Sequence, residues 1–199
     1  LTYLTMNRKY VIGIDFGTDS VRALVVATDN GEELASAVSA YPRWSKGLYC
    51  NPKVNQYRQH PQDYIDSLTE AVREAVGQCS DEVRLGIVGL SFDCTASTPV
   101  LTDKDGTPLA MLPEFQEHPD AMFILWKDHT AIAESDKINE VAKRWHTDYT
   151  RYGGGNHSCE WVWAKMLHSL RVAPELREKA YSWMEHCDWI SALLSGYTT

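Results

Sequence analysis

The stretch Tyr10-Val-Ile-Gly-Ile-Asp-Phe-Gly-Thr-Asp-Ser-Val-Arg-Ala-Leu-Val-Val-Ala27 decides the fold. Its two apolar runs, residues 10–15 and 21–27, are rich in Val, Ile and Leu and predict two β-strands. Asp15 ends the first run, and Gly17-Thr18 separates it from the second. This layout predicts a β-hairpin that carries a carboxylate beside a tight turn.

The chemistry of this turn suits a phosphate and a magnesium ion. Gly17 permits a tight turn, and its amide can approach a phosphate because no Cβ stands in the way. Thr18 and Ser20 add hydroxyl donors. Asp15 would hold Mg²⁺ through water molecules, because magnesium gives up its water shell reluctantly. The combination indicates an ATP-dependent phosphotransferase of the actin-like class; the alternative is an ordinary hairpin with an acid in its turn.

Two competing phosphate-binding motifs are missing from the sequence. There is no GxxxxGK[ST] segment, which excludes a P-loop. Gly13-x-Asp15-x-Gly17 is not the GxGxxG fingerprint, and no helical pattern follows it. A dinucleotide-binding fold is therefore disfavoured.

The order of the predicted elements points to the same fold class. Asp29-Asn30-Gly31 predicts a turn into a third strand over 33–41, helical spacing follows over 61–78, and a further apolar strand covers 83–92. The order β-β-β-α-β predicts an α/β fold, the ribonuclease-H-like core of actin-like ATPases, with a mixed β-sheet flanked by helices.

The remaining sequence predicts both strands and helices. We expect a long loop over 42–60, strands over 97–102, 107–112 and 183–187, helices over 130–145, 158–171 and 174–182, and a last helix from Asp188 to Gly196.

Composition restricts the partners and the compartment. With 19 Lys and Arg against 27 Asp and Glu, the net charge of −8 argues against nonspecific binding to nucleic acid or to an anionic membrane. No apolar run reaches the roughly 20 residues of a membrane span, and the first residues lack the apolar centre of a secretory signal. The five scattered cysteines form no CxxC pair, which predicts free thiols in a reducing cytoplasm.

Two further segments are candidates for a hydroxylated ligand. Trp126-Lys-Asp-His-Thr130 places a flat apolar surface next to charged groups, the mixture that a sugar site needs; the alternative is a helix cap by Asp128 with Trp126 in the core. Phe92-Asp-Cys-Thr-Ala-Ser-Thr98 follows a strand end, where small polar residues can line a cleft or merely form a turn at the edge of the sheet.

These motifs together resemble a known family. Asp15-Phe-Gly-Thr-Asp-Ser-Val-Arg22 resembles the first phosphate motif of the FGGY carbohydrate kinases. The resemblance as a whole covers about residues 8–197. Its narrower motifs resemble the L-ribulokinase branch of that family: Pro113-Glu-Phe115 with Ala121-Met-Phe-Ile-Leu-Trp-Lys-Asp-His-Thr-Ala131, Gly153-Gly-Gly155 with Ser158-Cys-Glu-Trp-Val-Trp-Ala-Lys165, Cys187-Asp-Trp189, and Leu193-Leu-Ser-Gly196.

The resemblance implies an activity and a set of contacts. The activity is phosphorylation of a small-molecule sugar, L-ribulose, to L-ribulose 5-phosphate in arabinose catabolism, with ATP and Mg²⁺. By motif match, Asp15, Gly17, Thr18 and Ser20 would contact the phosphates or magnesium, and Ala96 and Trp126-Lys127-Asp128 would lie along the sugar. An Arg-Glu pair typical of glycerol kinases is absent near Cys94-Thr95, which argues against glycerol.

The resemblance also implies that residues 8–199 are an incomplete N-terminal domain. Family members are much longer, and their catalytic aspartate and adenosine motif follow the point that corresponds to Thr199, so we assign no catalytic base and expect this segment alone to be inactive. The alternatives are another pentulose or hexulose kinase of the family and a noncatalytic sugar- or nucleotide-binding module. The sequence leaves open whether the protein forms a homodimer.

Overall fold

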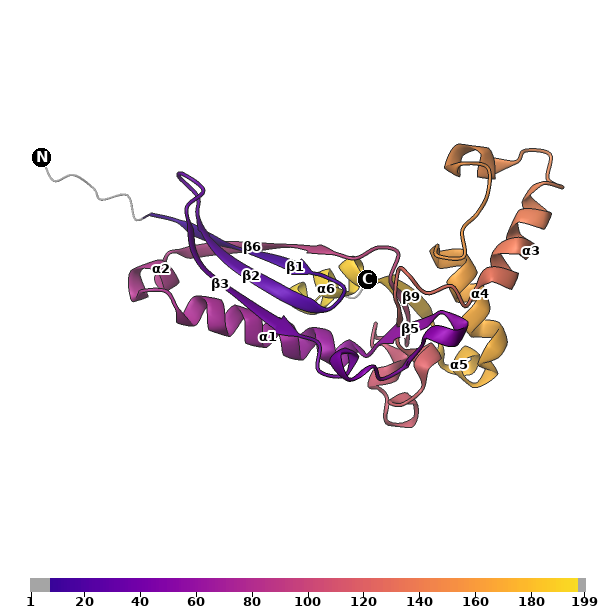
Figure 1. Ribbon diagram of the computed structural model, residues 1–199, viewed down its shortest axis with the longest axis horizontal. Coiled ribbons are helices and arrows are strands. Elements are labelled where there is room, and N and C mark those ends of the chain that lie inside the picture. The colour runs from indigo at the N-terminus through magenta and orange to yellow at the C-terminus, as the bar shows by residue number, and fades with distance from the viewer. Residues whose placement is uncertain (1–7, 197–199) are drawn as a thin grey trace, which may run out of the picture. The chain divides into compact units, whose positions relative to one another are not determined.

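The computed structural model describes residues 8–196, which form two compact units. The first unit contains residues 8–45 and 62–94, and the second contains residues 46–61 and 95–196. The chain therefore leaves the first unit after the third strand, returns for the long helix, and leaves it again after Cys94 (Figure 1).

The first unit contains a four-stranded mixed sheet (Figure 1). Its strands are β1 (Tyr10–Phe16), β2 (Ser20–Ala27), β3 (Glu33–Ala40) and β6 (Ile87–Cys94), in the order β3-β2-β1-β6. The pairs β1–β2 and β2–β3 are antiparallel, whereas β1 and β6 are parallel. The predicted hairpin, meander and mixed sheet are therefore confirmed.

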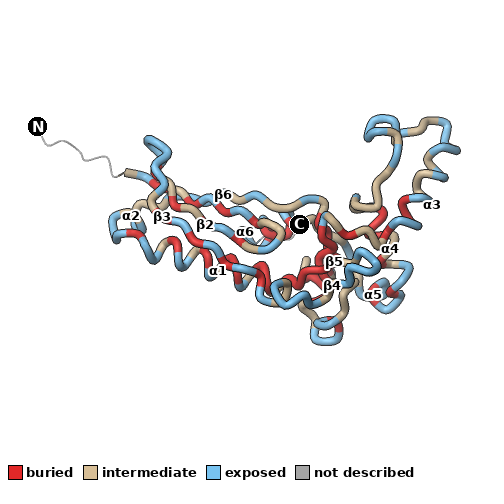
Figure 2. The backbone as a smooth tube through the Cα atoms, in the orientation of Figure 1, coloured by how far each residue is buried: buried red, intermediate tan, exposed pale blue. Residues whose placement is uncertain are grey.

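One side of this sheet is apolar because buried residues alternate along β1, β2 and β3 (Figure 2). The long helix α1 (Pro61–Gly77) packs against it. The ring of Tyr64 on α1 stands edge-on to Phe16 at 6.2 Å and to Tyr41 at 5.1 Å, and the Ser39 hydroxyl donates to Glu70 at 2.8 Å. Burial of such aromatic side chains contributes much of the stability of a small domain.

A short helix precedes β6 where the sequence predicted the start of a strand at residue 83. The helix α2 (Asp81–Leu85) begins after Ser80, whose hydroxyl accepts a hydrogen bond from the Val83 amide. This N-cap satisfies an amide that lacks a partner within the helix. The capped turn delays the strand to Ile87.

The second unit contains two small sheets and four helices. The strands β4 (Cys50–Asn51), β5 (Gln56–Gln59) and β8 (Phe123–Ile124) form one sheet, and β7 (Pro99–Thr102) pairs antiparallel with β9 (Ser182–Glu185). The helices are α3 (Ile132–Ala142), α4 (Val162–Val172), α5 (Pro174–Lys179) and α6 (His186–Ser195). The core of this unit includes Leu101, Leu109, Met122, Ile124, Met166 and Leu176.

Several predicted boundaries in this unit were wrong. The strand predicted over 107–112 is a 3₁₀ turn, Leu109–Met111, joined to β7 only by a bridge from Pro108 to Thr102, because the buried Leu109 and Ala110 turn into the core. The loop predicted over 42–60 contains β4 and β5.

The helix ends of this unit are governed by local backbone geometry. The helix predicted from 158 starts at Val162, because Trp161 before it has an extended backbone. The last helix starts at His186 instead of Asp188, whereas its predicted end is confirmed: Gly196 adopts a φ of 75°, a left-handed conformation that glycine adopts readily.

Among residues 8–196, no helix combines the length and the apolar character that crossing a membrane requires.

Candidate functional site

The residues predicted to contact phosphate lie together in the first unit, at the connection between β1 and β2. We call residues 15–20 the phosphate turn. Asp15 is half exposed, so its carboxylate is open to a ligand, and it lies 3.7 Å from the Arg22 guanidinium. In the sheet register Asp15 is paired with Asp93 on β6, which places a second carboxylate residue beside it at the strand ends. An exposed oxygen donor of this kind fits a hydrated magnesium ion.

One detail of the predicted phosphate contact needs correction. The Gly17 amide, which we expected to face a phosphate, donates to the Ser20 carbonyl at 3.0 Å and so closes the hairpin. A Cβ at residue 17 would lie 3.4 Å from the same carbonyl, an ordinary van der Waals contact. Gly17 thus shapes the turn, and the hydroxyl-bearing Thr18 and Ser20 are half-buried beside it.

The phosphate turn is held in place by residues that directly follow β3. The hydroxyl of the fully buried Tyr41 donates to the Gly17 carbonyl at 3.1 Å. The Tyr41 amide donates to the Asp19 carbonyl at 3.1 Å, and the Trp44 indole donates to the Asp19 carboxylate at 2.6 Å. These hydrogen bonds hold Gly17 and Asp19 in place, and they leave the Asp15 carboxylate exposed.

The first turn of α1 supports this arrangement through Asp63. Its buried carboxylate accepts hydrogen bonds from the backbone amides of Arg43 and Trp44 at 2.9 and 3.3 Å, and it pairs with the Arg43 guanidinium at 2.6 Å. Helix α1 therefore holds Arg43 and Trp44 through Asp63, and Trp44 holds Asp19 in the phosphate turn.

The residues predicted to contact the sugar lie in the second unit. Trp126 is 40% exposed, so its ring is available as a flat apolar surface. Lys127 places its ammonium 4.7 Å from the centre of the Tyr57 ring, a cation–π contact. The segment that carries both residues follows β8, and Leu125 just before it donates its amide to the Tyr57 carbonyl at 3.1 Å.

Asp128 differs from its neighbours because it is fully buried. One carboxylate oxygen accepts from the Tyr57 amide at 2.7 Å and from the Arg58 Nε at 2.9 Å; the other accepts from the amide and hydroxyl of Thr130 at 3.0 and 2.6 Å. Burial alone would raise the pKa of Asp128, but the Arg58 charge and these hydrogen bonds lower it below its ordinary value.

These contacts correct both expectations for Asp128. The carboxylate that we expected along the sugar is occupied by protein donors, and it also does not cap α3, which has no side-chain cap. Asp128 instead fixes the backbone beside Trp126 and Lys127.

Ala96 is exposed at the end of the Phe92–Thr98 segment. The peptide bond that follows it, Ala96–Ser97, is cis. Glu185 on β9 fixes this segment, because its carboxylate accepts from the Ser97 hydroxyl at 2.6 Å and from the Thr98 amide at 2.8 Å. A ligand that approached Ala96 would meet a small side chain on a firmly held backbone.

Comparison with known proteins identifies the family. The chain is 48% identical over 193 residues to the ribulokinase of Vibrio parahaemolyticus and 42% identical over 195 residues to that of Mycolicibacterium smegmatis, matches that cover 96% and 94% of the chain. The chain belongs to the ribulokinase family. It spans about a third (34%) of the length of these relatives and corresponds to their N-terminal part. No protein-family model matches the chain.

The fold also matches solved sugar kinases. A xylulose kinase from Bifidobacterium adolescentis superimposes with a TM-score of 0.68 at 18% identity, over 95% of this chain and 34% of that one. The actin-like fold predicted from the element order is thus confirmed for this ribulokinase-family chain.

The sequence did not indicate several residues that support the candidate site of this family member. Tyr41 and Asp63 hold the phosphate turn, and Arg58 holds Asp128. Arg58 lies in a segment whose sequence pattern predicts a loop, where a charged side chain is expected in solvent, but the structure buries it fully. Burial of a charge indicates a partner, but sequence alone does not name it.

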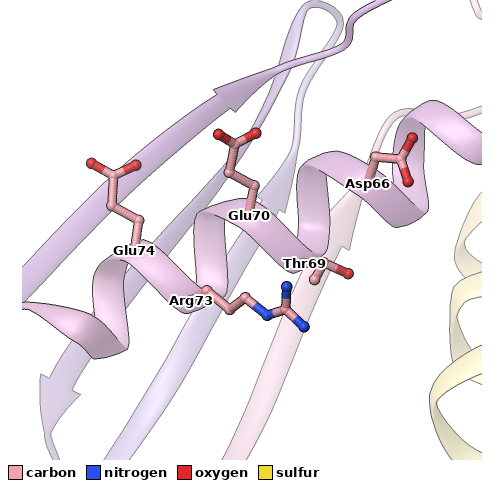
Figure 3. A pocket seen from close by; sticks show the side chains of 5 residues that line it. All are labelled: Asp66, Thr69, Glu70, Arg73 and Glu74. Carbon is pink, nitrogen blue, oxygen red and sulfur yellow. The ribbon is translucent and has the colours of Figure 1, made fainter.

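A concavity of about 640 Å³ along α1 is a poor candidate for the site. It is lined by Asp66, Thr69, Glu70, Arg73 and Glu74, all from one helix. Figure 3 shows Glu70 and Glu74 on one side of the helix and Arg73 on the other, so the charged groups do not converge on one point. No group of three His, Cys, Asp or Glu side chains within residues 8–196 is arranged to hold a metal ion directly.

Proposed function

We propose that the intact protein transfers the γ-phosphate of ATP to the 5-hydroxyl of L-ribulose, giving L-ribulose 5-phosphate and ADP. The observation that carries this proposal is the 48% identity to a ribulokinase over 96% of the chain. The exposed Asp15 at the hairpin turn supports it, because such a carboxylate can hold hydrated magnesium beside the phosphates.

In this proposal the phosphate turn receives ATP. Asp15 would hold magnesium through water, and the hydroxyls of Thr18 and Ser20 would donate hydrogen bonds to phosphate oxygens. Bound magnesium would neutralise charge on the transferring phosphoryl group. Tyr41 and Trp44 keep the turn in one conformation, which matters because phosphoryl transfer depends mainly on positioning and electrostatics.

The second unit receives the sugar. The exposed ring of Trp126 offers an apolar face to the carbon skeleton, Lys127 offers a cation, and the small Ala96 leaves room for a hydroxylated carbon. Asp128 acts behind them by fixing their backbone.

The proton of the 5-hydroxyl needs a base as the oxygen attacks phosphorus. We place this base, an aspartate, and the adenosine contacts in a second domain outside these 199 residues, because the chain spans about a third of its relatives. The five cysteines, none of which forms a disulfide, fit a reducing cytoplasm, where a pathway of arabinose catabolism would operate.

The decisive experiment is an ADP-release assay on the intact protein with ATP and MgCl₂. L-ribulose, D-ribulose, xylulose and gluconate are offered separately, and the product is identified by NMR as the 5-phosphate. We expect the highest kcat/KM for L-ribulose. A higher value for xylulose or gluconate would replace the substrate but keep the kinase, whereas no turnover of any sugar would leave a noncatalytic binding module.

A further inference from the structure

Lys165 is a fully buried lysine on α4, and within residues 8–196 its ammonium forms no ion pair with a carboxylate. Its ammonium donates to three backbone carbonyls instead: Ser97 at 2.6 Å, Leu125 at 3.0 Å and Ile124 at 3.5 Å. An ammonium group has three donors, so these acceptors use all of them. A buried charge without a counter-ion is costly, which makes the choice of a lysine here informative.

The carbonyls that Lys165 contacts belong to two segments far apart in the sequence. Ser97 follows Ala96, and Leu125 precedes Trp126, so one ammonium joins the backbones next to two residues predicted to contact the sugar. Both segments and Lys165 belong to the second unit.

Burial makes the charged form of Lys165 less favourable and lowers its pKa to about 8. The charge of Arg58 also lowers this pKa, whereas the Asp128, Glu185 and Glu160 carboxylates raise it. The side chain is still largely protonated at neutral pH, so it can donate all three hydrogen bonds.

Glu185 holds the Ala96–Thr98 backbone from a second direction. It accepts from the Ser97 hydroxyl and the Thr98 amide, whereas Lys165 binds the Ser97 carbonyl. The donor and acceptor groups of Ser97 are thus both fixed by charged side chains from separate elements, β9 and α4.

We infer that Lys165 is a positioning residue for the sugar substrate: it sets the separation of the Ala96 and Trp126 segments and so determines affinity and selectivity for the ketose. The inference rests on the proposed function, because it uses the same sugar-contacting residues. It also gives a role to Ser158-Cys-Glu-Trp-Val-Trp-Ala-Lys165, a motif that the phosphate and sugar contacts leave unexplained.

The test compares Lys165→Met with wild type in the intact protein. Methionine keeps an unbranched stem of similar size but removes the three donors. We expect KM for L-ribulose to rise about tenfold or more, while KM for ATP changes less than about twofold, as for an interaction that positions only one substrate. The preference for L-ribulose over D-ribulose should also fall.

Two further variants separate positioning from stability. Glu185→Gln weakens the contact of Glu185 with the Ala96–Thr98 backbone, so KM for L-ribulose should rise about threefold or more. If Lys165→Met does not fold, this variant tests whether holding that backbone affects sugar binding. Glu134→Gln is the matched control: Glu134 is buried on α3 and pairs with His168 and Arg171, so its loss should lower the melting temperature and leave KM for the sugar unchanged.

Calorimetric titration of L-ribulose into each protein distinguishes the two possible failures. If wild type neither binds nor phosphorylates any ketose, the proposed function is wrong. If wild type is active but Lys165→Met and Glu185→Gln keep wild-type KM and sugar affinity, Lys165 is a structural residue only and the inference is overturned.

Discussion

Asp15 shows what a single residue at a strand end can contribute. Its carboxylate is half exposed and paired only loosely with Arg22, at 3.7 Å, so solvent screening leaves this ion pair little effect on stability. Replacement by Asn should therefore preserve folding but remove the charge that would hold magnesium.

We expect Asp15→Asn to lower kcat of the intact protein by about a hundredfold or more, the typical cost of losing one group that stabilises developing charge. Steady-state assays at saturating ATP and magnesium measure this. Asp81→Asn, a change at a highly exposed carboxylate of the first unit, is the control and should leave kcat unaltered. An unchanged rate for Asp15→Asn would remove Asp15 from the site.

Asp128 has the opposite character, because its carboxylate is buried and accepts hydrogen bonds from Tyr57, Arg58 and Thr130. Asp128→Asn leaves the Arg58 charge without this partner, and we expect the free energy of unfolding to fall by about 3 kcal/mol at pH 7. The folded-state pKa of Asp128 is lowered, so its stabilisation is complete above its ordinary value of 3.8 and is lost as the pH falls through the folded-state value.

Urea unfolding at pH 7 and at pH 3 measures both effects. The difference between wild type and Asp128→Asn should shrink at the lower pH. The exposed Asp136→Asn is the control and should change stability little at either pH. Equal stability of wild type and Asp128→Asn at pH 7 would contradict a stabilising buried pair.

The sequence predicted the positions of residues at strand ends better than it predicted their hydrogen-bond and ion-pair partners. Asp15 and Ser20 could be placed near the strand ends because the apolar runs over 10–15 and 21–27 nearly coincide with β1 and β2. The burial of Asp128 could not be predicted, because it depends on Arg58, 70 residues away in the sequence. Local pattern does not specify such long-range pairs.

At the scale of elements, the first sheet was predictable because its first two strands are runs rich in Val, Ile and Leu, and Gly17-Thr18 and Asp29-Asn30-Gly31 mark the turns that follow them. The short elements were not. The strands β4 and β8 have two residues each, and Leu109–Met111 is as apolar as a strand although it forms a 3₁₀ turn. Packing in the core decides the conformation of such short apolar runs.

The junction of β9 and α6 contains a buried titratable group, His186, whose ring lies 5.3 Å from that of Phe123. Burial lowers its pKa from 6.5 to about 3, so the ring is neutral in the folded protein. The unfolded chain binds a proton below pH 6.5 that the folded protein does not, and stability therefore falls as the pH drops from 6.5 towards 3.

This contribution amounts to about 2 kcal/mol between pH 6.5 and pH 5, at roughly 1.4 kcal/mol per pH unit. His186→Phe should flatten the pH dependence of unfolding over this range, as measured by urea denaturation at half-unit steps. A His186→Phe variant with the wild-type slope would assign the acid sensitivity to other groups.

At the scale of the whole molecule, we propose that the kinase takes further groups from outside these 199 residues. The phosphate turn belongs to one compact unit, and the residues that we propose to contact the sugar belong to the other. The chain spans about a third of the length of its relatives. Phosphoryl transfer requires aligned reactants, a base for the hydroxyl proton and exclusion of water. A segment that lacks the base and the adenosine contacts can bind part of a substrate without reaching the transition state.

We therefore expect purified residues 1–199 to show no ATP-dependent phosphorylation of L-ribulose above about one thousandth of the intact protein's rate, because effective molarity and charge stabilisation are lost together. Circular dichroism of the segment shows whether it is folded. In the phosphorylation assay, the intact protein is the positive control and its Asp15→Asn variant is the low-activity control. A folded segment that turns over L-ribulose at a substantial fraction of the intact rate would mean that the base lies within residues 1–199. In that case Asp93, the register partner of Asp15, would be the first carboxylate to replace.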